Sequence, residues 1–246
     1  MTAARVFKTF ILGETCLRVA SDRFEEAVEA VREQRTILEG YIEDHPDFKT
    51  SMKPLAQDRG APAIVQRMTE ASRAAGVGPM AAVAGVFAQV AGEAASAAGS
   101  RDTIIDNGGD LYLDIDHDAV VGIYSGGSFG FDLLAFLVPP EDTPLSICSS
   151  SSKLGHSMSF GNCDLATVTA KNAALADAAA TRLANLVKTA EDLEGALETV
   201  SSVPGILGAL AIIGKHLGTA GKPPRIIRTD PSSTASRITV HPDHRF

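Results

Sequence analysis

Two side chains with hard oxygen atoms, Asp177 and Thr181, stand four residues apart in the run ADAAAT. On a helix this spacing puts both side chains on one face. A carboxylate and a hydroxyl suit Mg²⁺, which takes one or two protein ligands and keeps several waters. The surrounding run is apolar, so a carboxylate buried there needs a partner. We predict a metal site at Asp177 and Thr181. The alternative is a helix in which this spacing occurs by chance.

A glycine pair in the run IDNGGDLYL is the second candidate site. Gly108 and Gly109 follow an apolar segment, and glycines let backbone N–H groups approach a ligand or form an anion-binding nest. Asn107 and Asp110 flank the pair. We expect Asn107, Gly108 and Gly109 to bind a cofactor and Asp110 to act in catalysis. The alternative is a tight turn without a ligand.

The run GVGPM places Gly78 directly before Pro79. Proline is favoured at the first position of a helix, so a helix is expected to begin here. A glycine-rich loop that enters a helix N-terminus offers unpaired N–H groups to a phosphate. We therefore predict that Gly78 binds a cofactor, although one such loop does not by itself distinguish a phosphate site from an ordinary connection.

Residues 146–164 read SICSSSSKLGHSMSFGNCD and have three interpretations. Their hydroxyl, ammonium and imidazole groups can donate hydrogen bonds to a phosphate. Cys148 and Cys163 can instead carry thiol chemistry, with His156 or Lys153 lowering the pKa of a thiol. The third interpretation is a long polar loop without a ligand. Cys148 and His156 are our catalytic candidates, and the cofactor-binding candidates are Ser150, Ser151, Ser152, Lys153 and Gly155.

A further group of metal-ligand types occurs in the run LDIDHDAV. It contains Asp114, Asp116, His117 and Asp118, which fall between two predicted strands. A solvated turn is expected at such a place. We therefore interpret this group as a turn and not as a metal site.

The N-terminal elements follow from hydrophobic spacing. Residues 5–20 hold two β-rich runs joined by a two-residue link that contains glycine, which predicts a hairpin. A helix capped by Ser21 is expected to end at His45, before a proline. A second helix is predicted over residues 61–75.

Two alanine-rich helices, beginning near Pro79 and Asn172, are expected to be buried against a sheet, because small side chains permit close packing. Strands are predicted between residues 102 and 138, with a period of two, and in the run LATVTA. An amphipathic helix AEDLEGALETV and short strands ILGALAII, RIIR and RITV follow. This order predicts an α+β fold of layered sheets with buried alanine-rich helices. We expect a single domain with a hairpin and helix in residues 1–50, a core in 61–215 and short strands and a tail in 216–246.

Composition excludes several classes of partner. The 246 residues are 45% hydrophobic, enough for a sizeable core, and the net charge is −8. The sequence has no stripe of basic residues with aromatic residues between them, so we expect no nucleic-acid partner. Three cysteines without a CxxC pair suit a reducing compartment, and the first residues lack a signal-peptide pattern, so a cytoplasmic location is expected. No apolar stretch reaches the length of a membrane span, so we expect no membrane partner.

In chain order, GVGPMA, NGGD, the serine-rich run and ADAAAT resemble the ApbE-like superfamily, whose best-known members are magnesium-dependent FAD:protein FMN transferases. They are most similar to its uncharacterised cytoplasmic branch, in which a GPMA helix, an NGGD turn, a CSS…GHS…SFG run and an ADAAAT helix occur together. By motif, the resemblance covers residues 70–190. It implies an ApbE-like fold for the chain.

The resemblance implies that Asp177 and Thr181 hold Mg²⁺ and that the NGGD turn lies near a flavin nucleotide, FAD or FMN. It also places residues 150–156 beside an anion. The chain has no HIIDPxTG run after His156, and three function classes stay open. These are an FAD-binding enzyme that cleaves or transfers at the pyrophosphate, a sulfur-handling protein acting in sulfide use and homocysteine formation through Cys148, and a non-catalytic binding protein. The expected partner is a small nucleotide or anion, and a homo-oligomer is left open.

Overall fold

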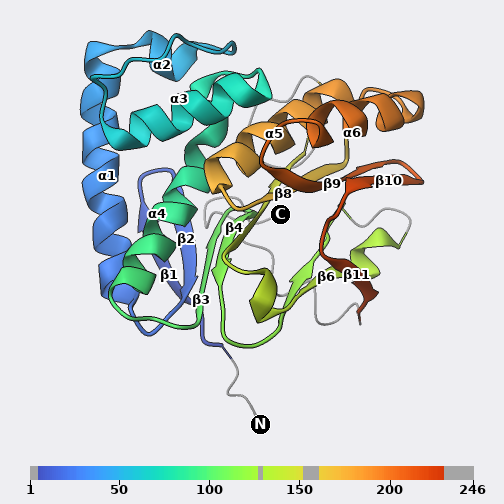
Figure 1. Cartoon of the computed structure of the whole chain (residues 1–246), viewed down its shortest axis with the longest axis horizontal. Coiled ribbons are helices and arrows are strands. Elements are labelled where there is room, and N and C mark those ends of the chain that lie inside the picture. Colours follow the sequence, from blue (N-terminus) through green and yellow to red (C-terminus); the bar gives the residue numbers. More distant parts are fainter. Residues whose placement is uncertain (1–4, 127–129, 152–160, 230–246) are drawn as a thin grey trace.

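The computed structural model describes residues 5–126, 130–151 and 161–229. Its centre is an eight-stranded sheet in the order β1-β2-β3-β4-β7-β8-β9-β10 (Figure 1), and all neighbouring strands in it are antiparallel. The N-terminal hairpin and the strands near the C-terminal end therefore share one sheet. The strands are β1 (Lys8–Leu12), β2 (Thr15–Ala20), β3 (Thr103–Asn107), β4 (Asp110–Asp114), β7 (Leu145–Ser150), β8 (Leu165–Ala170), β9 (Ile206–Ile213) and β10 (His216–Gly221).

A three-stranded sheet packs on one face of the large sheet. Its strands are β11 (Arg225–Arg228), β6 (Leu134–Val138) and β5 (Ala119–Gly122), in that order. Apolar side chains of both sheets meet in one core cluster, because alternate residues of each strand point to the same face. The cluster includes Ile104, Leu113, Phe136, Val138, Ile147 and Leu210.

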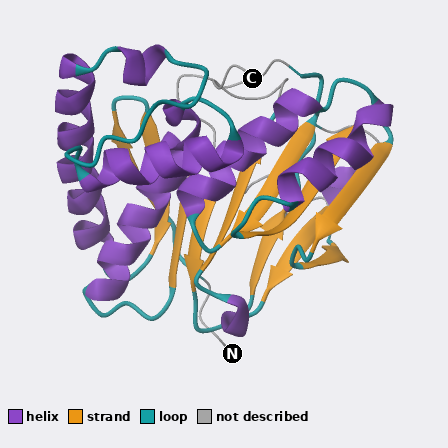
Figure 2. Cartoon of the chain, turned by 45° about the horizontal axis from the view of Figure 1, so that its top comes forward, coloured by secondary structure: helices purple, strands orange, loops and turns teal. Residues whose placement is uncertain are grey.

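Helices cover the other face of the large sheet (Figure 2). There α4 packs on β3 and β4, α5 packs on β7 and β8, and α6 packs on β9 and β10, while α1 lies against α4 and α3 against α5. The helices are α1 (Phe24–Asp44), α2 (Asp47–Thr50), α3 (Ala63–Ala75), α4 (Val83–Ala97), α5 (Ala173–Leu186) and α6 (Leu193–Ser201). Short 3₁₀ helices cover Pro79–Ala82, Phe131–Leu133, Pro140–Asp142 and Ala190–Asp192. The antiparallel sheets and segregated helices confirm the α+β prediction.

The predicted burial of the two alanine-rich helices is confirmed. In α5 eleven of fourteen residues are buried, and α4 buries seven of its fifteen. Small residues let the two helices approach closely: a Cβ built on Gly85 lies 2.3 Å from the carbonyl oxygen of Ala173. Together with the 3₁₀ turn before it, α4 is long and apolar enough to cross a membrane, the only such helix in the described part of the chain. Its packing between α1, α5 and the sheet is that of a core helix.

Several predicted elements need correction. The serine-rich segment begins as strand β7, so Ser146–Ser150 are not part of a loop. Residues 131–133 form a 3₁₀ turn, not the start of a strand, and strand β10 was not predicted at all. Helix α1 begins after Arg23, and the Ser21 hydroxyl instead hydrogen-bonds the hydroxyls of Ser100, in the loop before β3, and of Thr103, the first residue of β3. The predicted strand RITV lies outside the described residues.

Candidate functional site

The centre of the candidate site is a pair of buried carboxyl groups between the large sheet and the helices. Asp110 is the first residue of β4 and is 6% exposed, and Asp177 lies in the second turn of α5 and is 8% exposed. The side chain of Asp110 faces the helices, because Tyr112 on the same side of β4 belongs to the helix-side core. The sheet and α5 therefore bring together two carboxyls that are far apart in the sequence.

The N-terminus of α4 supplies a partner to Asp177. The backbone N–H of Gly85, in the first turn of α4, donates a 2.8 Å hydrogen bond to Asp177 Oδ2. Helix N-termini carry unpaired N–H groups and a positive dipole end, which favour a negative group there. A Cβ on Gly85 would lie 2.8 Å from the Cβ of Asp177. The contact therefore requires glycine at position 85.

The electrostatics of the pair favour a bound proton or a cation. Burial raises the pKa of Asp110 well above its usual range, and the carboxyl of Asp177 raises it further, while a hydrogen bond with Cys148 opposes this. Burial also raises the pKa of Asp177 to about 7, although the N–H groups of Gly85 and Ala84 lower it. Two neighbouring buried carboxyls resist joint ionisation unless positive charge joins them.

The NGGD segment is a tight hairpin turn that presents Asp110 to this space. Gly108 and Gly109 have φ angles of 68° and 104°, and they join β3 to β4 as a two-residue turn, a geometry that favours glycine. The side-chain amide of Asn107 donates a 3.0 Å hydrogen bond to the carbonyl of Ala84, which ties the hairpin to α4. The turn alternative is thus correct for the backbone, and the turn also fixes the position of a carboxylate.

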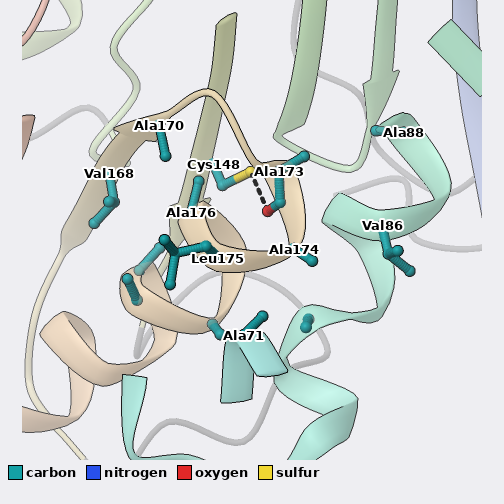
Figure 3. Packing of buried hydrophobic residues seen from close by; sticks show 14 of the residues in the cluster. Ala71, Val86, Ala88, Cys148, Val168, Ala170, Ala173, Ala174, Leu175 and Ala176 are labelled. Atoms are coloured by element: carbon teal, nitrogen blue, oxygen red, sulfur yellow. Dashed lines mark hydrogen bonds between the residues drawn. The ribbon is translucent and has the colours of Figure 1, made fainter. Parts of the chain in front are cut away.

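Strand β7 adds a thiol and a hydroxyl on the same side of the sheet. Cys148 lies directly opposite Asp110 in the pairing of β4 with β7, and Ser150 follows two residues later on the same face. The Sγ of Cys148 donates to the carbonyl oxygen of Ala173 at 3.6 Å (Figure 3). Burial, followed by the carboxyls of Asp110 and Asp177, raises the pKa of this thiol well above its usual value.

The residues present fit a divalent cation. Within the described residues, Asp110 Oδ1 and Ser150 Oγ are buried and have no hydrogen-bond partner, and buried polar atoms of a native protein usually have one. Thr181, 9% exposed, lies one turn beyond Asp177 on the same face of α5. Two carboxylates and a hydroxyl are an oxygen donor set for a divalent ion. We call Asp110, Asp177 and Thr181 the carboxylate site.

The remaining predicted site residues are Gly78 and Ser151, which the structure describes, and four that it does not. Gly78 is packed against the backbone of Ser51, since a Cβ there would lie 1.8 Å from the Ser51 carbonyl oxygen, and this contact explains the glycine without a ligand. Ser151 directly follows β7 and is 7% exposed. The predicted residues Ser152, Lys153, Gly155 and His156 lie outside the described residues.

The turn containing Asp116 and His117 comes close to a metal-ligand geometry. Ligand atoms of Asp102, Asp116 and His117 lie within 4.8 Å of one another. However, the guanidinium of Arg5 donates to both carboxylate oxygens of Asp102, at 2.7 and 2.8 Å, and to the backbone carbonyl of His117. The arginine therefore supplies positive charge to Asp102 at this partly exposed turn.

Sequence analysis missed two features of the site: the backbone groups that α4 supplies to it, and the position of the Cys148 thiol opposite Asp110. Neither Gly85 nor Ala84 carries a functional side chain, and only the glycine in the run AAVAGVF hinted at a close contact. That Cys148 lies opposite Asp110 depends on the register of two strands that are not consecutive in the sequence. No local pattern gives such a register.

Solved structures with a similar fold are ApbE proteins. The structure of the ApbE protein from Thermotoga maritima matches with a TM-score of 0.56 at 11% identity, covering 94% of this chain and 98% of its own. The flavinyl transferase ApbE of Pseudomonas stutzeri matches with a TM-score of 0.52 at 12% identity, covering 89% and 96%. At these identities the likeness establishes the fold, which is ApbE-like.

Sequence relatives define the family more narrowly. Residues 10–201 match the family model described as AbpE bacteria. A UPF0280 protein of Methanosarcina acetivorans is 40% identical over 231 residues, covering 92% of this chain and 91% of its own length. A UPF0280 protein of Archaeoglobus fulgidus is 44% identical over 186 residues, covering 74% and 76%. The chain therefore belongs to the ApbE-like superfamily, and within it to the AbpE bacteria family that the model describes.

Proposed function

We propose that this chain binds a divalent cation at the carboxylate site and uses it to hold the pyrophosphate of a flavin nucleotide such as FAD. The chain would then cleave the pyrophosphate bond or transfer the FMN part of the nucleotide. The observation that carries this proposal is the buried pair of Asp110 and Asp177, one of whose oxygens has no described partner. Mg²⁺ is the ion that the family resemblance implies. Asp177 and Thr181 would hold it from α5 and Asp110 from the sheet.

The chain's own groups would then position the nucleotide. A cation held there would neutralise charge that develops on phosphate oxygens as a phosphate bond breaks. Ser150, whose hydroxyl has no described partner, would donate a hydrogen bond to a phosphate oxygen from the floor of the site. The hydrogen bond from Asn107 to Ala84 would keep the hairpin against α4 and so hold Asp110 in place. The positive end of α4 favours an anion on the same side.

The choice of a flavin nucleotide is supported by the solved structure of similar fold that is named a flavinyl transferase. The proposed use of Cys148 as a working thiol has no comparable support. Its side chain is fully buried and its pKa is raised, whereas a reactive thiol needs exposure and a lowered pKa. The sulfur-handling hypothesis stays a prediction that no described contact favours.

Calorimetry tests the proposal. Titration of FAD into the protein should give tight binding with Mg²⁺ and weak binding after chelation, and Asp177→Asn should bind FAD equally weakly with or without Mg²⁺. The matched control is Asp114→Asn on the same strand as Asp110, since Asp114 accepts a hydrogen bond from Ser96 instead. Mg²⁺-dependent affinity that is unchanged in Asp177→Asn would reject the site. Chromatography of the same mixtures for released AMP separates a catalyst from a binding protein.

A further inference from the structure

The thiol of Cys148 belongs to the same small space as the carboxylate site, and the proposed function leaves it without a role. Residues directly opposite in an antiparallel pair have Cβ atoms about 4.5–5.5 Å apart on one face of the sheet, and Cys148 is directly opposite Asp110. Burial, followed by the carboxyls of Asp110 and Asp177, raises the pKa of this thiol, so Cys148 lies near both carboxyls. A side chain so placed can share a ligand with its neighbour.

A second observation points to a ligand in this space. Asp110 is 6% exposed, and its Oδ1 is buried without a hydrogen-bond partner in the described residues. Ser150 Oγ, on the same face of β7 as the thiol, is also buried without a hydrogen-bond partner in the described residues. The contact of Cys148 Sγ with the carbonyl oxygen of Ala173 satisfies neither of these two oxygens.

A sulfur donor changes which ion the site prefers. Mg²⁺ is a hard ion that binds oxygen, and thiolates select softer ions such as Zn²⁺. We propose that Cys148 is a further protein side chain on the metal, beside those of the carboxylate site, and that the site selects a thiophilic divalent transition metal such as Zn²⁺, Fe²⁺ or Co²⁺ over Mg²⁺. This inference rests on the proposed function, because it uses the same site, and it changes the identity of the ion.

Metal binding has a defined proton balance in this arrangement. The thiol proton of Cys148 and any proton held on Asp110 or Asp177 leave to solvent when the ion binds, since the metal ligands are a thiolate and carboxylates. Two carboxylates and a thiolate carry three negative charges against the two positive charges of the ion, so the loaded site keeps one net negative charge. No redox step is involved.

The other fully buried cysteine, in the segment before β8, serves as a matched control. Cys163 is also 0% exposed, and its Sγ contacts the carbonyl oxygens of Leu165 and Ile212 at 3.1 and 3.3 Å. Replacing it removes a buried thiol of the same size without touching strand β7 opposite Asp110. A general effect of losing a core cysteine would therefore appear in both variants, and a ligand effect only at Cys148.

The experiment is titration of the metal-free full chain with Co²⁺, followed by absorption spectroscopy. The wild type and Cys163→Ala should develop a sulfur-to-cobalt charge-transfer band, and Cys148→Ser should bind Co²⁺ without it. In competition, the preference for Zn²⁺ over Mg²⁺ should fall by about tenfold or more in Cys148→Ser. Should Cys148→Ser fail to fold, X-ray absorption of the zinc-loaded wild type and Cys163→Ala should still find one sulfur at about 2.3 Å.

The outcomes separate the inference from the proposed function. Cobalt bound by the wild type without the band, or zinc surrounded by oxygen and nitrogen alone, would overturn the role of Cys148 and leave the carboxylate site standing. A band that persists in Cys148→Ser would also overturn it. Failure of the wild type to bind any divalent ion, or binding that is unchanged in Asp177→Asn, would reject both.

Discussion

Replacing Asp177 by asparagine should stabilise the metal-free protein at pH 8. The asparagine side chain keeps an oxygen to accept the hydrogen bond from Gly85. The change removes a buried group that ionises at a cost. A residue that binds metal is expected to be a liability for stability when the metal is absent.

The magnitude follows from the pKa of Asp177, raised from 3.8 to about 7. Between these values the folded protein holds a proton that the unfolded chain has lost, so the stabilising effect of that proton falls as pH rises and is lost above about 7. From pH 5 to pH 7 this amounts to about 3 kcal/mol of unfolding free energy, at about 1.4 kcal/mol per pH unit. The raised pKa of Asp110 acts in the same direction. Between pH 5 and pH 8 the unfolding free energy of the wild type should therefore fall by at least about 3 kcal/mol. That of Asp177→Asn should fall by about 3 kcal/mol less than that of the wild type.

Urea unfolding of chelator-treated protein at pH 5 and pH 8 measures the effect. Asp114→Asn is the control and should follow the wild type at both pH values. Addition of a divalent ion at pH 8 should restore stability to the wild type and not to Asp177→Asn. Equal pH dependence in the wild type and Asp177→Asn would refute the reasoning, because it would mean that Asp177 ionises without a penalty in the folded state.

Three further changes test the surrounding structure. Gly85→Ala should lower the unfolding free energy by about 3 kcal/mol in urea, since its Cβ meets the Ala173 carbonyl at 2.3 Å, and a loss under 1 kcal/mol would contradict the close packing. Asn107→Ala should lower it by about 1 kcal/mol and weaken metal binding, because the hydrogen bond to Ala84 is lost. Asp110→Asn should weaken divalent-ion affinity by about tenfold or more in calorimetry while the circular dichroism spectrum stays unchanged; undiminished affinity would remove Asp110 from the site.

The helices and the glycine turn were the parts that sequence analysis predicted well. Pro79 and the alanine runs mark α4 and α5, because proline favours a helix start and small side chains permit burial. The NGGD segment indicates its own turn, since both glycines have a positive φ. Each of these features is determined by residues close together in the sequence, so the sequence alone predicts it.

The missed features depend on tertiary contacts. The segment SICSS has low intrinsic strand propensity, yet it pairs with β4 on one side and β8 on the other, and this central place in the sheet overrides the propensity. The pairing of Asp110 with Asp177 arises only when α5 packs over β7 beside β4. Likewise, Asp102 joins Asp116 and His117 through the pairing of β3 with β4.

The most direct test of the carboxylate site is a crystal structure of the full chain with Mn²⁺, using the anomalous signal of the ion. The account predicts one strong peak bonded to oxygens of both Asp110 and Asp177, within the range of about 2.0–2.6 Å found for hard divalent ions. A peak bonded to neither carboxylate, for instance at Asp102 and His117, would contradict it. So would well-ordered, metal-free carboxyls in crystals grown with an excess of Mn²⁺.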